Sequence, residues 1–276
     1  MFPILIRIGE FTIRTYGAIV AIAVITGIFI SMHYATKYKG IDEDTFINMA
    51  IWLIVGGILG ARIFWIFTSP WVDYYLQNPW HIVAIWEGGL SFEGMLGGGI
   101  IASAIVTRRY KTSFFKLLDS AAPGVAAGYG IGKWACFFNG CCHGIEATAS
   151  WWPKFFPFVT VFKNPLSECE ILNTPLYSAQ ILNSLGGWIT FIVLVSFIRK
   201  RKLRYHGQIF VLFSFVFSTF LFFIEYIRYI PTRFLSLTPN QWGAIAFIVS
   251  GIVLDRILRI RAPVTEIKEN KTEGEP

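Results

Sequence analysis

The chain has 276 residues, of which 54% are hydrophobic and 15% are charged, and its mean hydropathy is +0.55. Soluble domains carry about a quarter charged residues, so this composition excludes an ordinary soluble enzyme and favours a chain that lies in lipid. The formal net charge of +7 does not indicate a nucleic-acid partner, because the basic residues form short clusters between apolar runs.

The N-terminal segment, taken first in chain order, alternates apolar and polar side chains over its first 14 residues, with Ile4, Ile6 and Ile8 set against Arg7 and Glu10. This pattern suits an arm at the outer membrane interface. The segment lacks the basic region and small-residue cleavage site of a secretory signal, so we expect no processing.

Apolar segments long enough to cross a hydrocarbon core of about 30 Å follow along the chain. We therefore predict an all-α, polytopic membrane protein with about seven transmembrane helices, each satisfying its own backbone hydrogen bonds. The predicted spans are residues 16–35, 46–68, 89–106, 117–138, 177–198, 208–228 and 242–258. The stretch 139–176 is too polar and proline-rich to span and is expected to be a periplasmic loop. The polar tail 263–276 is expected to be disordered in the cytoplasm.

The basic residues set the orientation. Sixteen of the 24 Lys and Arg residues fall in one set of loops and at the C-terminus. The positive-inside rule then places the N-terminus outside and the C-terminus in the cytoplasm, which needs an odd number of crossings.

Ionisable side chains inside or beside the spans are the candidate functional groups, because each costs roughly 2.5–3.5 kcal/mol on insertion scales. Asp119 and Asp255 lie near basic clusters and Glu87 precedes its span, so we interpret these three as span-end charges. The functional candidates are Arg62, Glu93, Lys133, Glu225 and Arg228. For the last two, which are three residues apart, a purely structural ion pair is an open alternative.

A glycine-rich segment at 86–99 surrounds Glu93. Small residues permit close helix contact, which accounts for Gly97 to Gly99. They do not account for the carboxylate, which on a glycine-lined surface offers a base next to accessible backbone.

A second segment, 128–144, places Lys133 about one turn from the outer end of its span, within reach of a phospholipid phosphate. Cys136, Cys141 and Cys142 follow, and Cys169 is more distant. Adjacent cysteines without a CxxC spacing argue against zinc. An external disulfide, with Cys169 as one conceivable partner, and buried small side chains both stay open.

Motifs along nearly the whole chain, apart from the tail, resemble the bacterial phosphatidylglycerol–prolipoprotein diacylglyceryl transferases. They occur in the family's order at residues 8–17, 60–62, 86–92, 137–140 with Gly144, 174–177 and 225–228. The resemblance implies seven spans with the N-terminus outside. It also implies transfer of the diacylglyceryl group of phosphatidylglycerol to a lipobox cysteine, which forms a thioether and releases glycerol phosphate.

The resemblance also assigns roles within a membrane-embedded domain at 1–262 of a bacterial inner-membrane protein. It implies catalytic Glu93, Lys133 and Arg228, and the substrate-binding residues Tyr16, Arg62, Ser91, Asn139, Gly140, Gly144, Tyr177 and Glu225. No metal and no cofactor are implied, and we expect a monomer.

The pattern departs from the family's at several positions. Glu93 stands where the family typically has His, and Lys133 stands where it has an Arg. Cys136 replaces a family Asn, and Leu221 replaces a family Arg. These departures leave two alternatives open. One is a diverged paralogue that uses another lipid or acceptor, and the other is a non-catalytic lipid-binding membrane protein.

Overall fold

The computed structural model describes residues 2–8, 11–69, 71–85, 89, 92–200, 203–230 and 234–261. The predicted tail, 263–276, lies outside the described residues, as do Glu87 and Ser91. The chain forms two compact units, one made of residues 1–33 and 118–276 and the other of residues 34–117.

The first unit is mainly helical. Its N-terminal segment is an antiparallel hairpin rather than a simple arm, with β1 pairing Arg7 with Thr12 of β2. The elements that lie wholly or largely in this unit are β1 (Ile4–Ile8), β2 (Phe11–Arg14), α1 (Thr15–Lys39), α6 (Phe114–Asn139), β3 (Val159–Val161), β4 (Pro175–Tyr177), α7 (Ala179–Lys200), α8 (Gln208–Ile224), the 3-10 helix η2 (Glu225–Ile227) and α9 (Pro239–Arg261).

The predicted spans all overlap helices, and among the described residues four segments are long and apolar enough to cross a membrane. These are Thr15–Lys39, Glu43–Phe67, Ala179–Lys200 and Gln208–Ile227. The prediction of a helix through Arg228 is wrong at its end. The α-helix stops at Ile224, one 3-10 turn follows, and Arg228 is extended with ψ of 141°.

Small residues let helices of the first unit approach closely, which a membrane interior favours. A Cβ on Gly187 of α7 would lie 2.8 Å from the backbone nitrogen of Gly130 in α6, and a Cβ on Gly27 of α1 would lie 3.1 Å from the carbonyl oxygen of Gly124. These contacts hold α6 against α1 and α7, and they fix where the last turn of α6 lies.

The start of α8 is capped from another helix. Gly207, at the N-cap, has φ of 101° and offers no side chain. The buried Asp119 carboxylate of α6 instead accepts the backbone N–H groups of Gly207 at 2.8 Å, Ile209 at 2.9 Å and Phe210 at 3.0 Å. A carboxylate at a helix N-terminus satisfies its unpaired amides and complements its dipole. The interpretation of Asp119 as a span-end charge is confirmed.

Asp255 is the second span-end charge. It accepts from the Arg259 Nε at 2.7 Å on α9 and from the Tyr205 hydroxyl. Burial, followed by the neighbouring Asp255, raises the pKa of Tyr205 to about 12, so this phenol stays protonated and keeps donating. The interpretation of Asp255 as a structural charge near a helix end is confirmed too.

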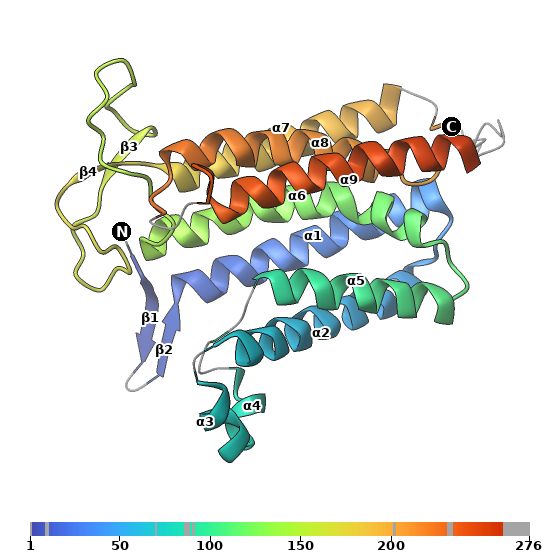
Figure 1. Cartoon of the computed structure of the whole chain (residues 1–276), viewed down its shortest axis with the longest axis horizontal. Coiled ribbons are helices and arrows are strands. Elements are labelled where there is room, and N and C mark those ends of the chain that lie inside the picture. Colours follow the sequence, from blue (N-terminus) through green and yellow to red (C-terminus); the bar gives the residue numbers. More distant parts are fainter. Residues whose placement is uncertain are drawn as a thin grey trace. The chain divides into compact units, whose positions relative to one another are not determined.

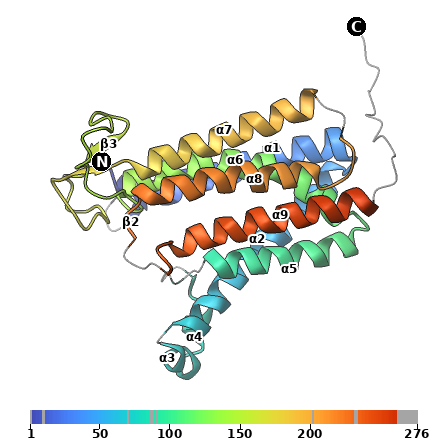
Figure 2. The ribbon, with the colours of Figure 1, turned by 45° about the horizontal axis from the view of Figure 1, so that its top comes forward.

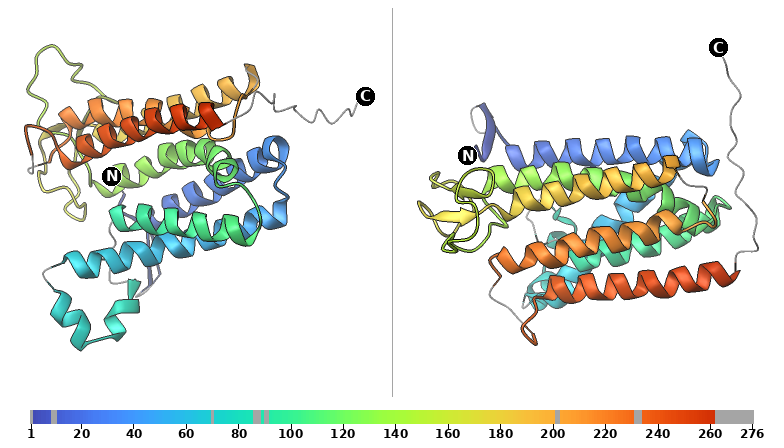
Figure 3. Two further views of the ribbon diagram at one scale, coloured as in Figure 1. Left: turned by 45° about the vertical axis from the view of Figure 1, so that its right-hand side comes forward. Right: turned by 90° about the horizontal axis from the view of Figure 1, so that it is seen from above.

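The loop between α6 and α7 folds on itself. Its strands β3 and β4 pair antiparallel, with Thr160 opposite Leu176. Phe162, Cys169 and Leu176 form a small buried cluster. Figure 1 shows this loop beside the last turn of α6, and Figures 2 and 3 show the same placement.

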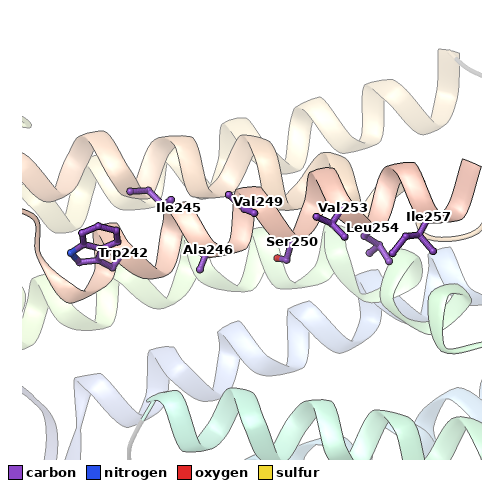
Figure 4. Close-up of a pocket in the computed structure, with 8 residues that line it drawn as sticks. All are labelled: Trp242, Ile245, Ala246, Val249, Ser250, Val253, Leu254 and Ile257. Atoms are coloured by element: carbon purple, nitrogen blue, oxygen red, sulfur yellow. The ribbon is translucent and has the colours of Figure 1, made fainter.

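One side of α9 carries a shallow open pocket, whose lining residues are drawn in Figure 4. Apart from one serine its lining is apolar, as suits a helix face against acyl chains. The lining residues are Trp242, Ile245, Ala246, Val249, Ser250, Val253, Leu254 and Ile257.

The second unit pairs α2 (Glu43–Thr68) with α5 (Phe92–Arg109), and the short helices α3 (Val72–Gln77) and α4 (Trp80–Val83) follow α2. A Cβ on Gly60 of α2 would lie 2.7 Å from the Cα of Gly98, so the backbones touch. The prediction of glycine-mediated contact is confirmed at Gly98 but wrong at Gly97 and Gly99. A Cβ on either of those two would meet no atom of another described element within 4 Å.

Candidate functional site

The last turn of α6 and the residues after it gather three thiols. Gly140, with φ of +87°, turns the chain after the helix, and Cys142 is also left-handed, with φ of 57°. These turns bring the sulfur atoms of Cys136, Cys141 and Cys142 within 4.8 Å of one another. All three cysteines are reduced, as is Cys169, so the disulfide that the sequence left open is not formed here. The Asn139 amide lies 3.8 Å from the Cys141 sulfur.

Gly144 is the point where three chain segments meet. Its N–H donates to the Tyr177 carbonyl at 2.8 Å, and the next residue, Ile145, donates to the Ile227 carbonyl at 2.9 Å. A Cβ on Gly144 would lie 2.6 Å from the Tyr177 oxygen and 2.7 Å from the Ile227 oxygen. Glycine is therefore required for the segment after η2 to lie against the loop.

Arg228 follows directly from that contact. Its backbone pairs with Gly144, which turns its side chain toward the thiols. One terminal nitrogen lies 3.4 Å from the Cys142 sulfur, and the other lies 3.5 Å from a carboxylate oxygen of Glu225. The predicted pair of Glu225 and Arg228 is confirmed, although it lies on a 3-10 turn rather than on one α-helical face.

Glu225 is buried and anchored from the segment before α9. One of its oxygens accepts from the Thr238 hydroxyl at 3.2 Å and from the Asn240 amide at 2.7 Å. A buried carboxylate is stable only when it is paired and hydrogen-bonded. These bonds therefore fix Glu225, and Glu225 in turn fixes the direction of Arg228.

Lys133 supplies a second cation, one turn before Cys136 on α6. Its ammonium lies over the ring of Tyr129, 4.8 Å from the ring centroid, as in a cation–π contact. The Tyr129 hydroxyl donates to the Asn183 side chain at 2.8 Å, which fixes the ring. Tyr16, at the start of α1, is half-exposed and lies close enough to interact electrostatically with the three cysteines.

The Cys142 thiol is the most acidic of the cluster. Hydrogen bonds from the Cys136 and Cys141 thiols, followed by the charges of Lys133 and Arg228, hold its pKa well below the ordinary range. The same hydrogen bonds raise the pKa of Cys141, because its thiol is a donor within the cluster. The positive charges of Arg228 and Lys133 near Cys142 make this end of α6 suited to an anion.

The remaining predicted residues belong to the second unit. Arg62 is buried and donates to the carbonyl oxygens of Ile82 at 3.0 Å, Gly89 at 3.2 Å and His81. It thus ties α4 and Gly89 to α2. Glu93 is in the first turn of α5, but its side chain lies outside the described residues, as does Ser91.

The structure therefore brings eight of the eleven predicted site residues into one unit. They are Lys133, Arg228, Tyr16, Asn139, Gly140, Gly144, Tyr177 and Glu225. Sequence reasoning missed Thr238, Asn240 and Tyr129, which position the charged groups. Nothing in the pattern around Thr238 and Asn240 distinguishes them from ordinary polar residues before a helix.

Comparison with known proteins identifies the family of the chain. The family model described as prolipoprotein diacylglyceryl transferase matches residues 3–256. Similar proteins are named phosphatidylglycerol–prolipoprotein diacylglyceryl transferase. The one from Listeria monocytogenes serotype 4b is 31% identical over 95% of this chain and 92% of its own length. Those from Gloeobacter violaceus and Thermosynechococcus vestitus are each 30% identical, over 91% and 81% of this chain and over 90% and 80% of their own lengths.

Proposed function

Because the chain belongs to the prolipoprotein diacylglyceryl transferase family, we propose that it transfers the diacylglyceryl group of phosphatidylglycerol to the lipobox cysteine thiol of a prolipoprotein. The thiolate sulfur forms a bond to the glycerol carbon, and the bond from that carbon to the phosphate oxygen breaks. The products are a thioether and glycerol phosphate. The observation that carries the proposal is the pair of cations, Arg228 and Lys133, at the end of α6.

The departing phosphate needs positive charge where its own charge develops. Arg228 supplies a planar fork of five N–H donors, and two contacts, to Glu225 and to Cys142, orient it. Lys133 supplies a point charge, and its ammonium lies over the ring of Tyr129. We assign both residues to the phosphate, with Asn139 and Tyr16 beside it positioning the headgroup.

The attacking thiol must lose its proton, because the thiolate is the nucleophile. We assign this proton to Glu93 in the first turn of α5. Arg62 and Ser91 are assigned to substrate binding in the same unit. The hydrogen bonds of Arg62 to three backbone carbonyls give it the further task of holding α4 and Gly89.

The chain is a membrane protein, and for its topology we infer seven spans with the N-terminus outside and the C-terminus in the cytoplasm of a bacterial inner membrane. Four described segments meet the length and hydropathy of a span. The basic clusters supply the orientation. This topology places the end of α6 and its two cations at the outer leaflet.

The test uses the full chain, purified in detergent, with phosphatidylglycerol and a peptide that contains one lipobox cysteine. We expect a peptide mass increase equal to one diacylglyceryl group, together with stoichiometric release of glycerol phosphate. A peptide with serine in place of the cysteine is the control and should stay unmodified. If monodisperse protein leaves the cysteine peptide unmodified and also fails to restore lipoprotein maturation in transferase-depleted cells, the proposal is wrong.

A further inference from the structure

The proposed reaction takes its reacting thiol from the acceptor, so Cys136, Cys141 and Cys142 supply no reacting group in it. Cys142 takes a left-handed conformation that non-glycine residues seldom adopt. That conformation directs its sulfur back toward Cys136 on the helix, so that all three sulfur atoms lie within 4.8 Å. Unusual backbone conformations of this kind cluster at ligand sites.

We propose that Cys136, Cys141 and Cys142 bind one thiophilic metal ion, such as Zn²⁺, Cd²⁺ or Cu⁺. Thiolate ligands select such soft or borderline ions. With metal–sulfur bonds of about 2.3 Å, sulfur atoms around a tetrahedral ion lie about 3.8 Å apart. The three thiols therefore need a contraction of about 1 Å at most, which side-chain rotation of half-buried cysteines provides.

The charges around the cluster suit such a complex. Three thiolates around a divalent ion leave one net negative charge. The Arg228 guanidinium lies 3.4 Å from the Cys142 sulfur, and Lys133 acts on the same sulfur. Groups that hydrogen-bond to metal ligands orient them and contribute to affinity. Arg228 is thus a positioning residue for the metal.

A disulfide is the competing fate of the same thiols. Cys141 and Cys142 are adjacent, so their Cα atoms lie about 3.8 Å apart, below the roughly 4.4 Å that disulfides usually require. A disulfide within the cluster would have to use Cys136 and would leave the third thiol unused. The close approach of all three sulfur atoms therefore fits a metal ion better than a disulfide between two of them.

Metal binding would also regulate transfer, and this part rests on the proposed function. An ion held by Cys142 would draw Arg228 onto the ligand sulfur and away from a phosphate. We expect the loaded protein to be a slower transferase. Metal binding itself needs no substrate, so it can succeed or fail independently of the proposed activity.

The experiment titrates Cd²⁺ into the full chain, reduced and metal-free in detergent, and follows sulfur-to-cadmium charge-transfer absorption. We expect about one ion per chain. C142S and C136S should abolish the band, C169S should retain it as the matched control, and R228Q should weaken the affinity by about 10–100-fold.

A second measurement needs no variant. Bound Cd²⁺ should protect Cys136, Cys141 and Cys142 from alkylation mapped by mass spectrometry, whereas the labelling of Cys169 should be the same with and without the ion. The proposal would be overturned if the chain did not bind Cd²⁺, or if the absorption band survived in both C142S and C136S. It would also be overturned if Cd²⁺ changed the alkylation of Cys169 as much as that of the other three cysteines. A disulfide between Cys136 and Cys141 or Cys142, trapped by alkylation in intact cells, would overturn it as well.

Discussion

Replacing Arg228 by Gln tests the proposed phosphate site most directly. Gln removes the positive charge and the fork of donors but keeps a polar side chain of moderate length. Losing one preorganised donor to a developing oxyanion costs about 10²–10³ in rate, or about 2.7–4 kcal/mol. We expect R228Q to lower kcat by that factor. R228K keeps the charge but loses bidentate geometry, so its loss should be smaller, about 10-fold.

The stability cost of R228Q should be smaller than its effect on activity. Glu225 keeps its bonds from Thr238 and Asn240, and the Arg228 contact is long, at 3.5 Å. We expect a loss of about 1–2 kcal/mol in unfolding free energy. Release of glycerol phosphate at saturating lipid measures the rate, and thermal unfolding in detergent measures stability.

The matched control is R259Q, which breaks an Arg–carboxylate pair on α9. Arg259 is 61% exposed, so solvent screens its pair with Asp255 and its loss should change stability little and leave kcat within about twofold. A folded R228Q that keeps kcat within about threefold of the native value would refute the assignment of Arg228 to the phosphate.

Three other predictions concern the fold and the thiols. D119N should lower unfolding free energy by about 2–4 kcal/mol in thermal unfolding, because an amide cannot accept all three backbone N–H bonds at the start of α8. G98A should destabilise by about 1–3 kcal/mol in the same measurement through backbone overlap, whereas G97A should be neutral or slightly stabilising. Cys142 should react with iodoacetamide below pH 8, since its lowered pKa keeps the thiolate populated as the pH falls, whereas Cys169, whose pKa is raised by burial, should not.

Each of these has an outcome that contradicts it. Equal melting temperatures for D119N and the native chain would show that the amides of α8 have other acceptors. Equal changes in unfolding free energy for G98A and G97A would mean that α2 and α5 do not touch at Gly98. A steep decline of Cys142 labelling between pH 9 and pH 7, unchanged in R228Q, would show an ordinary thiol.

The helices were predictable because lipid demands long apolar segments, and that signal is local. The end of α8 was not, since Glu225 and Arg228 have ordinary helical spacing. The chain leaves the helix there because Ile227 and Arg228 pair with Gly144 and Ile145, more than 80 residues away in sequence. Such long-range backbone pairing leaves no periodic pattern to read.

The charged site residues were predictable for a related reason. A cation such as Lys133 in an apolar segment is costly and therefore conspicuous. The thiol cluster was not predictable, because its geometry depends on the left-handed backbone of Cys142 after the turn at Gly140. Spacing alone indicated that adjacent cysteines are poor ligands, and the conformation that joins them to Cys136 is set by the folded loop.

The open alternative for Glu225 and Arg228, a purely structural ion pair, can be weighed against the pair on α9. Arg259 and Asp255 approach to 2.7 Å, the distance of a closed charge-assisted bond. Glu225 and Arg228 are separated by 3.5 Å, and Glu225 makes its short bond, 2.7 Å, to the Asn240 amide instead. An ion pair whose role is structural would be expected at the short distance that Arg259 and Asp255 show on α9. Glu225 therefore anchors the guanidinium and fixes its direction, which the proposed phosphate site would require.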